Sequence, residues 1–200
     1  MKVRNVTTNV SAVVIGASTG GIEALQQIFR CIENEFTLAV IVVIHLPPSG
    51  QSMLPSVFEG YAFKRVKEAE DKEKIEAGTL YFAPHNYHLL IESDSTFSLS
   101  SDEPVSFARP SIDVLFESAT DAFGDQLIGI LLSGANEDGA KGVYAIGKAG
   151  GIVLVQEPSS AVASAMPLAG AAACAEAKQM SPAVIGSYLN KLGGSAYATK

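Results

Sequence analysis

Three residues whose types can together perform nucleophilic catalysis are spread along this 200-residue sequence: Ser18, His45 and Asp138. Ser18 lies in Gly16-Ala17-Ser18-Thr19-Gly20, which has the form of a nucleophile elbow, a sharp turn whose small neighbours expose the serine oxygen. Serine is a weak nucleophile alone, because it needs a base to remove its proton and the base needs a carboxylate to hold its tautomer. If the fold brings the three together, the sequence predicts a serine hydrolase.

The glycine-rich stretch also has a second interpretation, since a glycine-rich turn that enters a helix can cradle an anion. A dinucleotide fingerprint would need a second glycine where Ser18 stands, and a P-loop would need a lysine followed by Ser or Thr, where Gly21 is followed by Ile22. Nucleotide binding is therefore disfavoured. From this stretch alone, two interpretations remain open: Ser18 is a nucleophile, or the turn binds a phosphate group.

His45 and Asp138 each have a simpler structural explanation. His45 could be an ordinary histidine at the end of a strand, and Asp138 could cap the helix that follows it at Gly139. A zinc site built from His45, His85 and His88 lacks the H-E-x-x-H or paired-cysteine spacing of such sites. We therefore predict no metal and no cofactor.

Further along the chain, Arg109 precedes Pro110-Ser111 and has two interpretations. It either marks the start of a helix or reaches into a cleft to bind a carboxylate or backbone oxygen of a substrate. The acidic residues in this part of the sequence are expected on solvated faces; they are Asp113, Glu117, Asp121, Asp125 and Glu157.

The elements that must position these residues alternate between apolar strands and amphipathic helices. The predicted strands are residues 11–17, 36–44, 79–83, 127–132, 152–155 and 178–180, and the predicted helices are residues 20–32, 53–58, 112–123, 138–148, 166–174 and 182–192. Residues 64–76 are expected to form a solvated strand and turn, residues 88–99 a β-hairpin, and residues 156–165 a loop that contains a helical turn. This order predicts an α/β fold, a mainly parallel, doubly wound sheet with helices on both faces and a β-hairpin insertion. Since sites in such sheets form beyond the carboxyl ends of the strands, the three candidate residues should meet at one edge.

Composition narrows the class of protein. The formal net charge of -7 argues against nucleic-acid binding, which needs a basic face. No apolar run approaches the ~20 residues that span a bilayer, and the polar N-terminus lacks a signal-peptide core, so we expect a cytoplasmic protein without membrane insertion. Cys31 and Cys174 are expected to be buried free thiols. The predicted organisation is a flexible leader at 1–10, one catalytic domain at 11–193 and a flexible tail at 194–200.

Six segments in order along nearly the whole chain resemble the catalytic domain of the bacterial chemotaxis protein-glutamate methylesterases. They are VIGASTGG (14–21), VVIHLPP (42–48), LYFAP (80–84) with HL (88–89), RPSIDVLF (109–116), LSGANEDGA (132–140), and QEP (156–158) with AMP (165–167). The resemblance implies a Rossmann-like fold that is distinct from the α/β-hydrolases, whose triad has the order Ser, Asp, His.

The resemblance also implies an activity and roles for named residues. The expected enzyme hydrolyses glutamate γ-methyl esters on the cytoplasmic helices of chemoreceptors and releases methanol, and some members also deamidate receptor glutamines. The implied roles are Ser18 as nucleophile, His45 as general base, Asp138 as the orienting acid, the backbone N–H of Ala135 as an oxyanion donor where many members carry methionine, Thr19 beside the nucleophile, and Arg109 and Met166 in the cleft.

The partner implied by the resemblance is the cytoplasmic domain of a methylated chemoreceptor. The usual family member carries an N-terminal phosphorylatable receiver domain, whereas here about ten residues precede the first predicted strand. Three interpretations follow: a stand-alone esterase, a chain cut to the catalytic domain, or a relative controlled in another way, for which a separate receiver protein is a second partner. The alternative function is a catalytically silent module of the same fold that binds a receptor or an anion.

Overall fold

The protein is built on a seven-stranded sheet in the order β3-β4-β2-β1-β7-β8-β9, in which every neighbouring pair is parallel. The computed structural model describes residues 10–33, 36–46 and 53–193. The strands are β1 (Ala12–Ala17), β2 (Ala39–Ile44), β3 (Arg65–Glu68), β4 (Thr79–Phe82), β7 (Leu127–Leu131), β8 (Ile152–Gln156) and β9 (Lys178–Met180). The chain builds outward from β1 in both directions, so β1 lies at the topological switch point where such sheets carry their sites.

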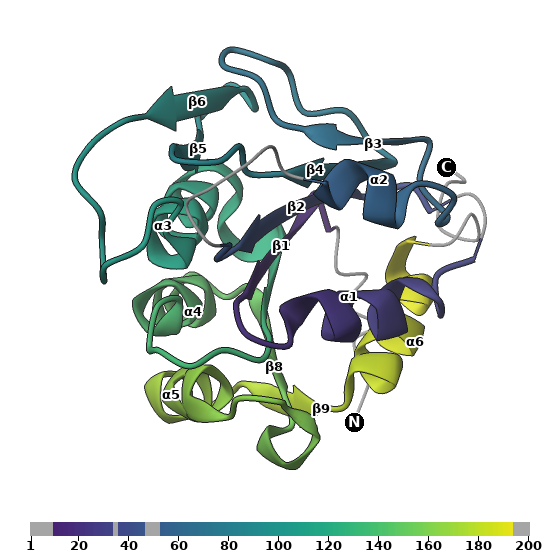
Figure 1. Cartoon of the computed structure of the whole chain (residues 1–200), viewed down its shortest axis with the longest axis vertical. Helices are drawn as coiled ribbons and strands as arrows, with labels where there is room; N and C mark the ends of the chain where they lie inside the picture. The colour runs from purple at the N-terminus through teal and green to yellow at the C-terminus, as the bar shows by residue number, and fades with distance from the viewer. Residues whose placement is uncertain (1–9, 34–35, 47–52, 194–200) are drawn as a thin grey trace, which may run out of the picture.

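Helices cover both faces of this sheet, as the sequence predicts (Figure 1). One face carries α1 (Gly21–Phe29), α2 (Leu54–Phe58) and α6 (Pro182–Gly193), and the other carries α3 (Ile112–Phe123), α4 (Ala140–Lys148) and α5 (Ala165–Ala173). Successive strand residues point to opposite faces, so Val13 and Ile15 enter the core beneath α1 while Val14 enters the core beneath α3. Burial on both faces is the reason that the central strands are continuously apolar.

The predicted hairpin insertion is also present. β5 (His88–Ile91) and β6 (Phe97–Ser100) pair antiparallel and pack over α3. The backbone N–H of Ile91 donates to the Ser118 hydroxyl of that helix at 3.1 Å. The hairpin thereby places His88 next to the start of α3, which matters for the site.

Two helix boundaries differ from the sequence prediction by two residues or more, and the others agree to within one residue. The helix predicted at 20–32 ends at Phe29, and the helix predicted at 138–148 begins at Ala140. Gly139 has φ 95°, a left-handed conformation that no α-helix continues, and it separates Asp138 from α4. The solvated strand predicted within 64–76 is the short edge strand β3, and the helical turn predicted within 156–165 is a 3₁₀ turn at Pro158–Ser160.

The predicted leader, apart from Val10, and the predicted tail lie outside the described residues, as does most of the loop after His45. The domain limits therefore stay predictions. Within the part of the chain that the structure describes, no helix has the length and apolar character that a membrane span requires.

Candidate active site

Ser18 and His45 leave the sheet side by side because β1 and β2 are parallel and in register. Ala17 pairs with Ile44, so the next residue of each strand is a candidate catalytic residue. The backbone N–H of His45 donates to the carbonyl of Ala17 at 3.0 Å, and the N–H of Ser18 donates to the carbonyl of Ser133 at 2.9 Å. The backbone of Ser18 is therefore bonded to the loop after β7, and Ala17 at the end of β1 is bonded to His45.

A tight turn carries Ser18 into α1. The N–H of Gly21 donates to the carbonyl of Ser18 at 2.8 Å, and Gly20 has φ 79°. A Cβ on Gly20 would lie 2.5 Å from the Cβ of Val162 and 3.0 Å from the hydroxyl of Ser133. Backbone conformation and packing both require glycine here, which is the physical content of the Gly-x-Ser-x-Gly pattern.

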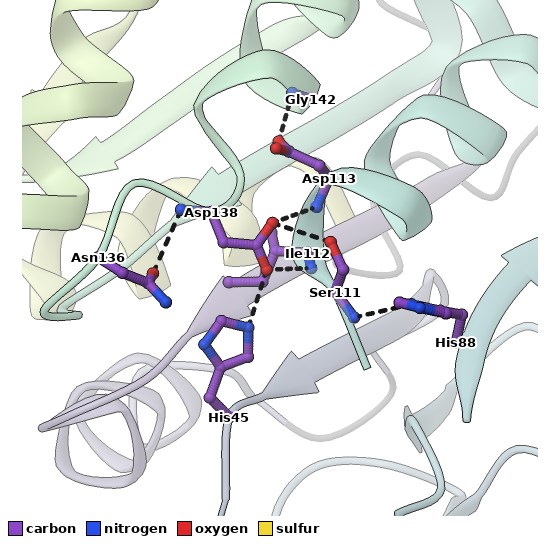
Figure 2. A network of polar contacts seen from close by, with 8 residues as sticks. All are labelled: His45, His88, Ser111, Ile112, Asp113, Asn136, Asp138 and Gly142. Carbon is purple, nitrogen blue, oxygen red and sulfur yellow. Dashed lines mark hydrogen bonds and ion pairs between the residues drawn. The ribbon is translucent and has the colours of Figure 1, made fainter. Parts of the chain in front are cut away.

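His45 forms a hydrogen bond with Asp138, as Figure 2 shows. The Nε2 atom of His45 lies 2.9 Å from Oδ2 of Asp138; the two side chains are 13% and 0% exposed. An ionised carboxylate only accepts hydrogen bonds, so Nε2 carries the proton and Nδ1 presents its lone pair. Within the described residues no hydrogen bond joins the Ser18 hydroxyl to His45, and Nδ1 has no partner, which leaves it free to act as a base.

The carboxylate of Asp138 is held by the start of α3. Its Oδ1 accepts hydrogen bonds from the hydroxyl of Ser111 (2.9 Å) and the N–H of Asp113 (3.1 Å), and its Oδ2 accepts one from the N–H of Ile112 (2.7 Å). Asp138 is thus a helix cap, as its simpler explanation suggested, but it caps α3 rather than the helix that follows it. The N-cap of α4 is Gly139, which offers no side chain.

These contacts keep Asp138 ionised. Burial on its own would raise the pKa of this carboxyl group, but the hydrogen bonds from His45, Ile112 and Asp113 outweigh burial and hold the pKa below its ordinary value. The positive end of the α3 dipole acts in the same direction. His45 therefore faces a carboxylate that stays ionised at neutral pH.

Asp113 does not lie on a solvated face, and the sequence prediction for it is wrong. Its side chain is only 3% exposed, and its Oδ1 accepts a hydrogen bond from the N–H of Gly142 at 2.8 Å. Burial raises the pKa of Asp113, and the negative charge of Asp138 raises it further. The hydrogen bond from Gly142 lowers the pKa, but the net result is a pKa above the ordinary value. The start of α3 thus holds Asp138, while the start of α4 holds Asp113.

The expected oxyanion donors, Ala135 and Thr19, are both exposed at the same edge of the sheet. Within the described residues neither backbone N–H donates a hydrogen bond, so both are available to a ligand. The carbonyl of Thr19 accepts the Ser133 hydroxyl at 2.6 Å, which ties the nucleophile turn to the loop that carries Ala135.

Sequence reasoning missed two residues that hold these loops. Ser133 donates its N–H to the side-chain oxygen of Gln156 at 2.9 Å, and its hydroxyl accepts the N–H of Ala163 at 2.9 Å. Gln156 is 2% exposed and donates in turn to the carbonyl of Ser160 at 3.1 Å. A glutamine at the end of an otherwise apolar strand was the signal that could have found it, because a buried amide needs partners.

Met166 does not line an open cleft, because its side chain is fully buried. It packs beneath the loop of residues 132–139, called the oxyanion loop here because it carries the expected donor Ala135. The N–H of Met166 donates to the carbonyl of Gly134 at 2.9 Å, and a Cβ on Gly134 would lie 2.5 Å from the terminal methyl group of Met166. Met166 supports the loop from below, and the role that the resemblance assigns to it is corrected accordingly.

Arg109 is also engaged within the protein. Its guanidinium donates twice to the side-chain oxygen of Asn86, at 3.1 and 2.8 Å, and to the carbonyls of Ser101 (2.7 Å) and Asp102 (2.9 Å). The helix start that was one of its two interpretations is present, since α3 begins at Ile112 with Ser111 as its N-cap, and the role of Arg109 towards a substrate stays a prediction. Arg109 fastens the loop between β6 and α3.

The three histidines do not form a metal site in the described part of the chain. No group of three or more His, Cys, Asp or Glu residues there could hold an ion. His45 is bonded to Asp138, whereas both ring nitrogens of His88 are bonded to backbone atoms of Glu103 and Ser111.

Comparisons with a family model, with related sequences and with solved structures all point to the same family. Residues 13–189 match the model of a family described as CheB methylesterase. A relative from Leptospira interrogans, named a putative protein-glutamate methylesterase/protein-glutamine glutaminase, is 45% identical over 159 residues, 80% of this chain and 82% of the relative. An enzyme of the same name without "putative", from Symbiobacterium thermophilum, is 36% identical over 155 residues, 78% of this chain but 43% of its own length. The crystal structure of the Thermotoga maritima CheB methylesterase catalytic domain superposes with a TM-score of 0.84 at 27% identity, covering 92% of this chain and 98% of that one.

Proposed function

We propose, because this chain belongs to the CheB methylesterase family, that it hydrolyses glutamate γ-methyl esters on the cytoplasmic helices of chemoreceptors and releases methanol. The observation that carries the proposal is the His45–Asp138 pair, 2.9 Å apart, at the strand end that lies in register with Ser18. Nucleophile, base and orienting carboxylate then stand in the order that serine esterases need.

The proposed first step is attack by the Ser18 hydroxyl oxygen on the ester carbonyl. The proton of Ser18 passes to Nδ1 of His45, since Nε2 already carries a proton that is bonded to Asp138. This use of Nδ1 follows from the observed pairing. The imidazolium then gives its proton to the methoxide oxygen as the C–O bond breaks, and methanol leaves an acyl-enzyme.

Water completes the cycle. His45 takes a proton from a water molecule as the water oxygen attacks the acyl carbon, and it returns that proton to Ser18 when the ester bond to serine breaks. The tetrahedral oxyanion of each step needs fixed donors. The unoccupied backbone N–H groups of Ala135 and Thr19, at the same edge of the sheet, are the groups that we assign to this role.

The same acyl-enzyme would form from a glutamine side chain, with ammonia in place of methanol as the leaving group. The names of the relatives from Leptospira interrogans and Symbiobacterium thermophilum include protein-glutamine glutaminase. We propose that this second activity belongs to the same three residues. We place the enzyme in the cytoplasm, where receptor helices are found, and a separate phosphorylatable receiver protein is the regulatory partner that we propose.

The test is methanol release from a methylated chemoreceptor cytoplasmic fragment. The parent protein should release methanol, and Ser18→Ala should lower kcat by about three or more orders of magnitude. Ser56→Ala is the matched control and should retain the parent rate, because Ser56 is exposed on α2 and, in the described part of the chain, no hydrogen bond joins it to the candidate site residues. A folded parent that releases no methanol would contradict the proposal.

The alternative, a silent binding module, is favoured only by the missing hydrogen bond between Ser18 and His45. Such bonds are often long in enzymes without substrate and tighten in the complex. Labelling with an organophosphonate separates the two functions, because an activated Ser18 reacts and an unactivated serine does not.

A further inference from the structure

His88 contributes a polar side chain close to the candidate active site, although neither the triad nor the oxyanion loop uses it. It opens β5 and is 2% exposed. Its Nδ1 lies 3.2 Å from the backbone nitrogen of Ser111, and its Nε2 lies 3.1 Å from the carbonyl oxygen of Glu103 (Figure 2 shows the first of these contacts). Both ring nitrogens are therefore satisfied inside the protein.

The two partners fix the protonation of this ring. The backbone nitrogen of Ser111 is a donor, so Nδ1 of His88 must offer its lone pair. The carbonyl of Glu103 is an acceptor, so Nε2 must carry the hydrogen. Only the neutral Nε2–H tautomer satisfies both bonds, and a proton on Nδ1 would point at the N–H of Ser111.

The residue that His88 holds is the one that organises Asp138. The N–H groups at a helix start have no partner within the helix, and here they are divided between two acceptors. The N–H of Ser111 points back to His88, while the hydroxyl of Ser111 and the N–H groups of Ile112 and Asp113 point forward to Asp138. Moving the backbone of Ser111 would move all three donors to the carboxylate.

We propose that His88 is a positioning residue of the esterase, which fixes the orientation of the Asp138 carboxylate through Ser111 and thereby that of His45. The proposal rests on the function proposed above. His88 touches neither substrate nor reacting atoms. It acts through a continuous series of hydrogen bonds: His88 to Ser111, Ser111 to Asp138, and Asp138 to His45.

The alternative is a purely structural role, in which His88 only holds the β5–β6 hairpin against α3. A matched pair of amide variants separates the two roles. In His88→Asn the side-chain oxygen can occupy the place of Nδ1 and accept from Ser111, whereas in His88→Gln the amide nitrogen can occupy the place of Nε2 and donate to Glu103. Both variants lose the ring and keep one of its two hydrogen bonds.

We expect His88→Gln to lower kcat by roughly tenfold to ~10²-fold with KM little changed, the size of loss expected when a catalytic group is misplaced by about 1 Å. His88→Asn should stay within about threefold of the parent kcat, because the bond to Ser111 is retained. A purely structural role predicts instead that the two variants lose activity equally and in proportion to the folded fraction measured by thermal unfolding.

A spectroscopic readout keeps the proposal testable apart from activity. In protein labelled with ¹⁵N-histidine, His88 should show a protonated Nε2 and an unprotonated Nδ1. The Nε2–H resonance of His45 should be preserved in His88→Asn and shifted or exchange-broadened in His88→Gln. Equal kcat values in the two variants, an unchanged His45 resonance in His88→Gln, or an Nδ1–H tautomer at His88 would overturn the proposal. If the parent released no methanol, the proposed function would fail, while these resonances would still decide whether His88 orients the Asp138–His45 pair.

Discussion

Asp138 has two tasks that depend on the same two oxygen atoms. It accepts the Nε2–H of His45, and it accepts three donors from the start of α3. Hydrogen bonds to a charged group contribute about 1.5–3 kcal/mol each, more than those between neutral groups. The carboxylate that we propose as the orienting acid is therefore also a strong tie between the loop after β7 and α3, and it cannot reorient without breaking its bonds to both His45 and α3.

This double task predicts a large effect for Asp138→Asn. The amide has one acceptor oxygen, so its NH₂ group must face donors from α3 or from His45. We expect kcat to fall by about 10⁴-fold, as when the orienting acid of a triad becomes an amide and the histidine tautomer is lost. Steady-state methanol release measures this fall in kcat, and Asp125→Asn, at an exposed position, is the control. Activity within tenfold of the parent would show that Asp138 does not orient the base.

At the scale of elements, the site depends on three loops at the carboxyl edge of the sheet that bond to one another. The turn after β1 bonds to the loop after β7 through Ser18 and Thr19, and Ser133 links that loop to the segment before α5. The start of α3 holds the carboxylate of Asp138, which lies in the loop before α4. The start of α4 holds the carboxylate of Asp113, which lies in the first turn of α3. Hydrogen bonds between these loops, the strand ends and the helix starts therefore set the geometry.

Gly20→Ala tests how far packing constrains the nucleophile turn. It should destabilise the fold by ~1–3 kcal/mol through backbone strain, with a further cost because the new Cβ overlaps Val162. Gly60→Ala is the matched control: Gly60 has φ 91° but no atom within 4 Å of the added Cβ, so it carries the strain without the overlap. Urea unfolding and phosphonate labelling of Ser18 measure the two effects. Equal losses of stability and of labelling in both variants would argue against a packing constraint at Gly20.

At the scale of the whole molecule, two buried carboxyl groups make opposite contributions to stability. The pKa of Asp138 is held below its ordinary value, so its contribution is present at neutral pH and is lost as the pH falls through the folded-state pKa. The pKa of Asp113 is raised by burial. Between the unfolded and folded pKa values of Asp113, the folded state binds more protons, so its ionisation lowers stability as the pH rises.

Asp113→Asn should therefore gain stability relative to the parent as the pH is raised from about 4 towards 7. The amide keeps an oxygen for the N–H of Gly142 and removes the buried charge. Urea unfolding at several pH values measures the difference, with exposed Asp121→Asn as the control. A difference that does not change with pH would contradict the assignment of the raised pKa to Asp113.

The two thiols give a second test of global stability. Cys174 is buried between α4 and α5, and burial raises its thiol pKa. Cys31 is half-buried, which corrects the expectation that both are buried. Alkylation of the native protein followed by mass spectrometry should modify Cys31 first and Cys174 only at the rate of unfolding. Equal rates at the two sites would show that α5 opens locally.

The sequence by itself determined the order of the elements and the edge at which the site lies. Continuous apolar runs joined by amphipathic helices leave few alternatives to a parallel sheet covered on both faces, and Ser18 and His45 end two of its strands whatever the details. The glycine pattern around Ser18 is visible in the sequence, since the backbone conformation of such a turn depends on residues that are adjacent in the chain, although Val162 and Ser133 add a packing constraint at Gly20. These features depend on short-range periodicity and backbone chemistry.

Only the tertiary structure decided which helix start holds Asp138, which backbone group binds Asp113, and which atoms the guanidinium of Arg109 binds. A carboxylate next to a helix start looks the same in sequence whether it caps its own helix or another one. The choice here depends on the packing of α3 against α4, 25 or more residues away along the chain. His88 is the same case: its type and its position in a strand are local, but its bond to Ser111 exists only because the hairpin folds over α3. Pairings between distant segments are set by the shape of the core, which no single stretch of sequence contains.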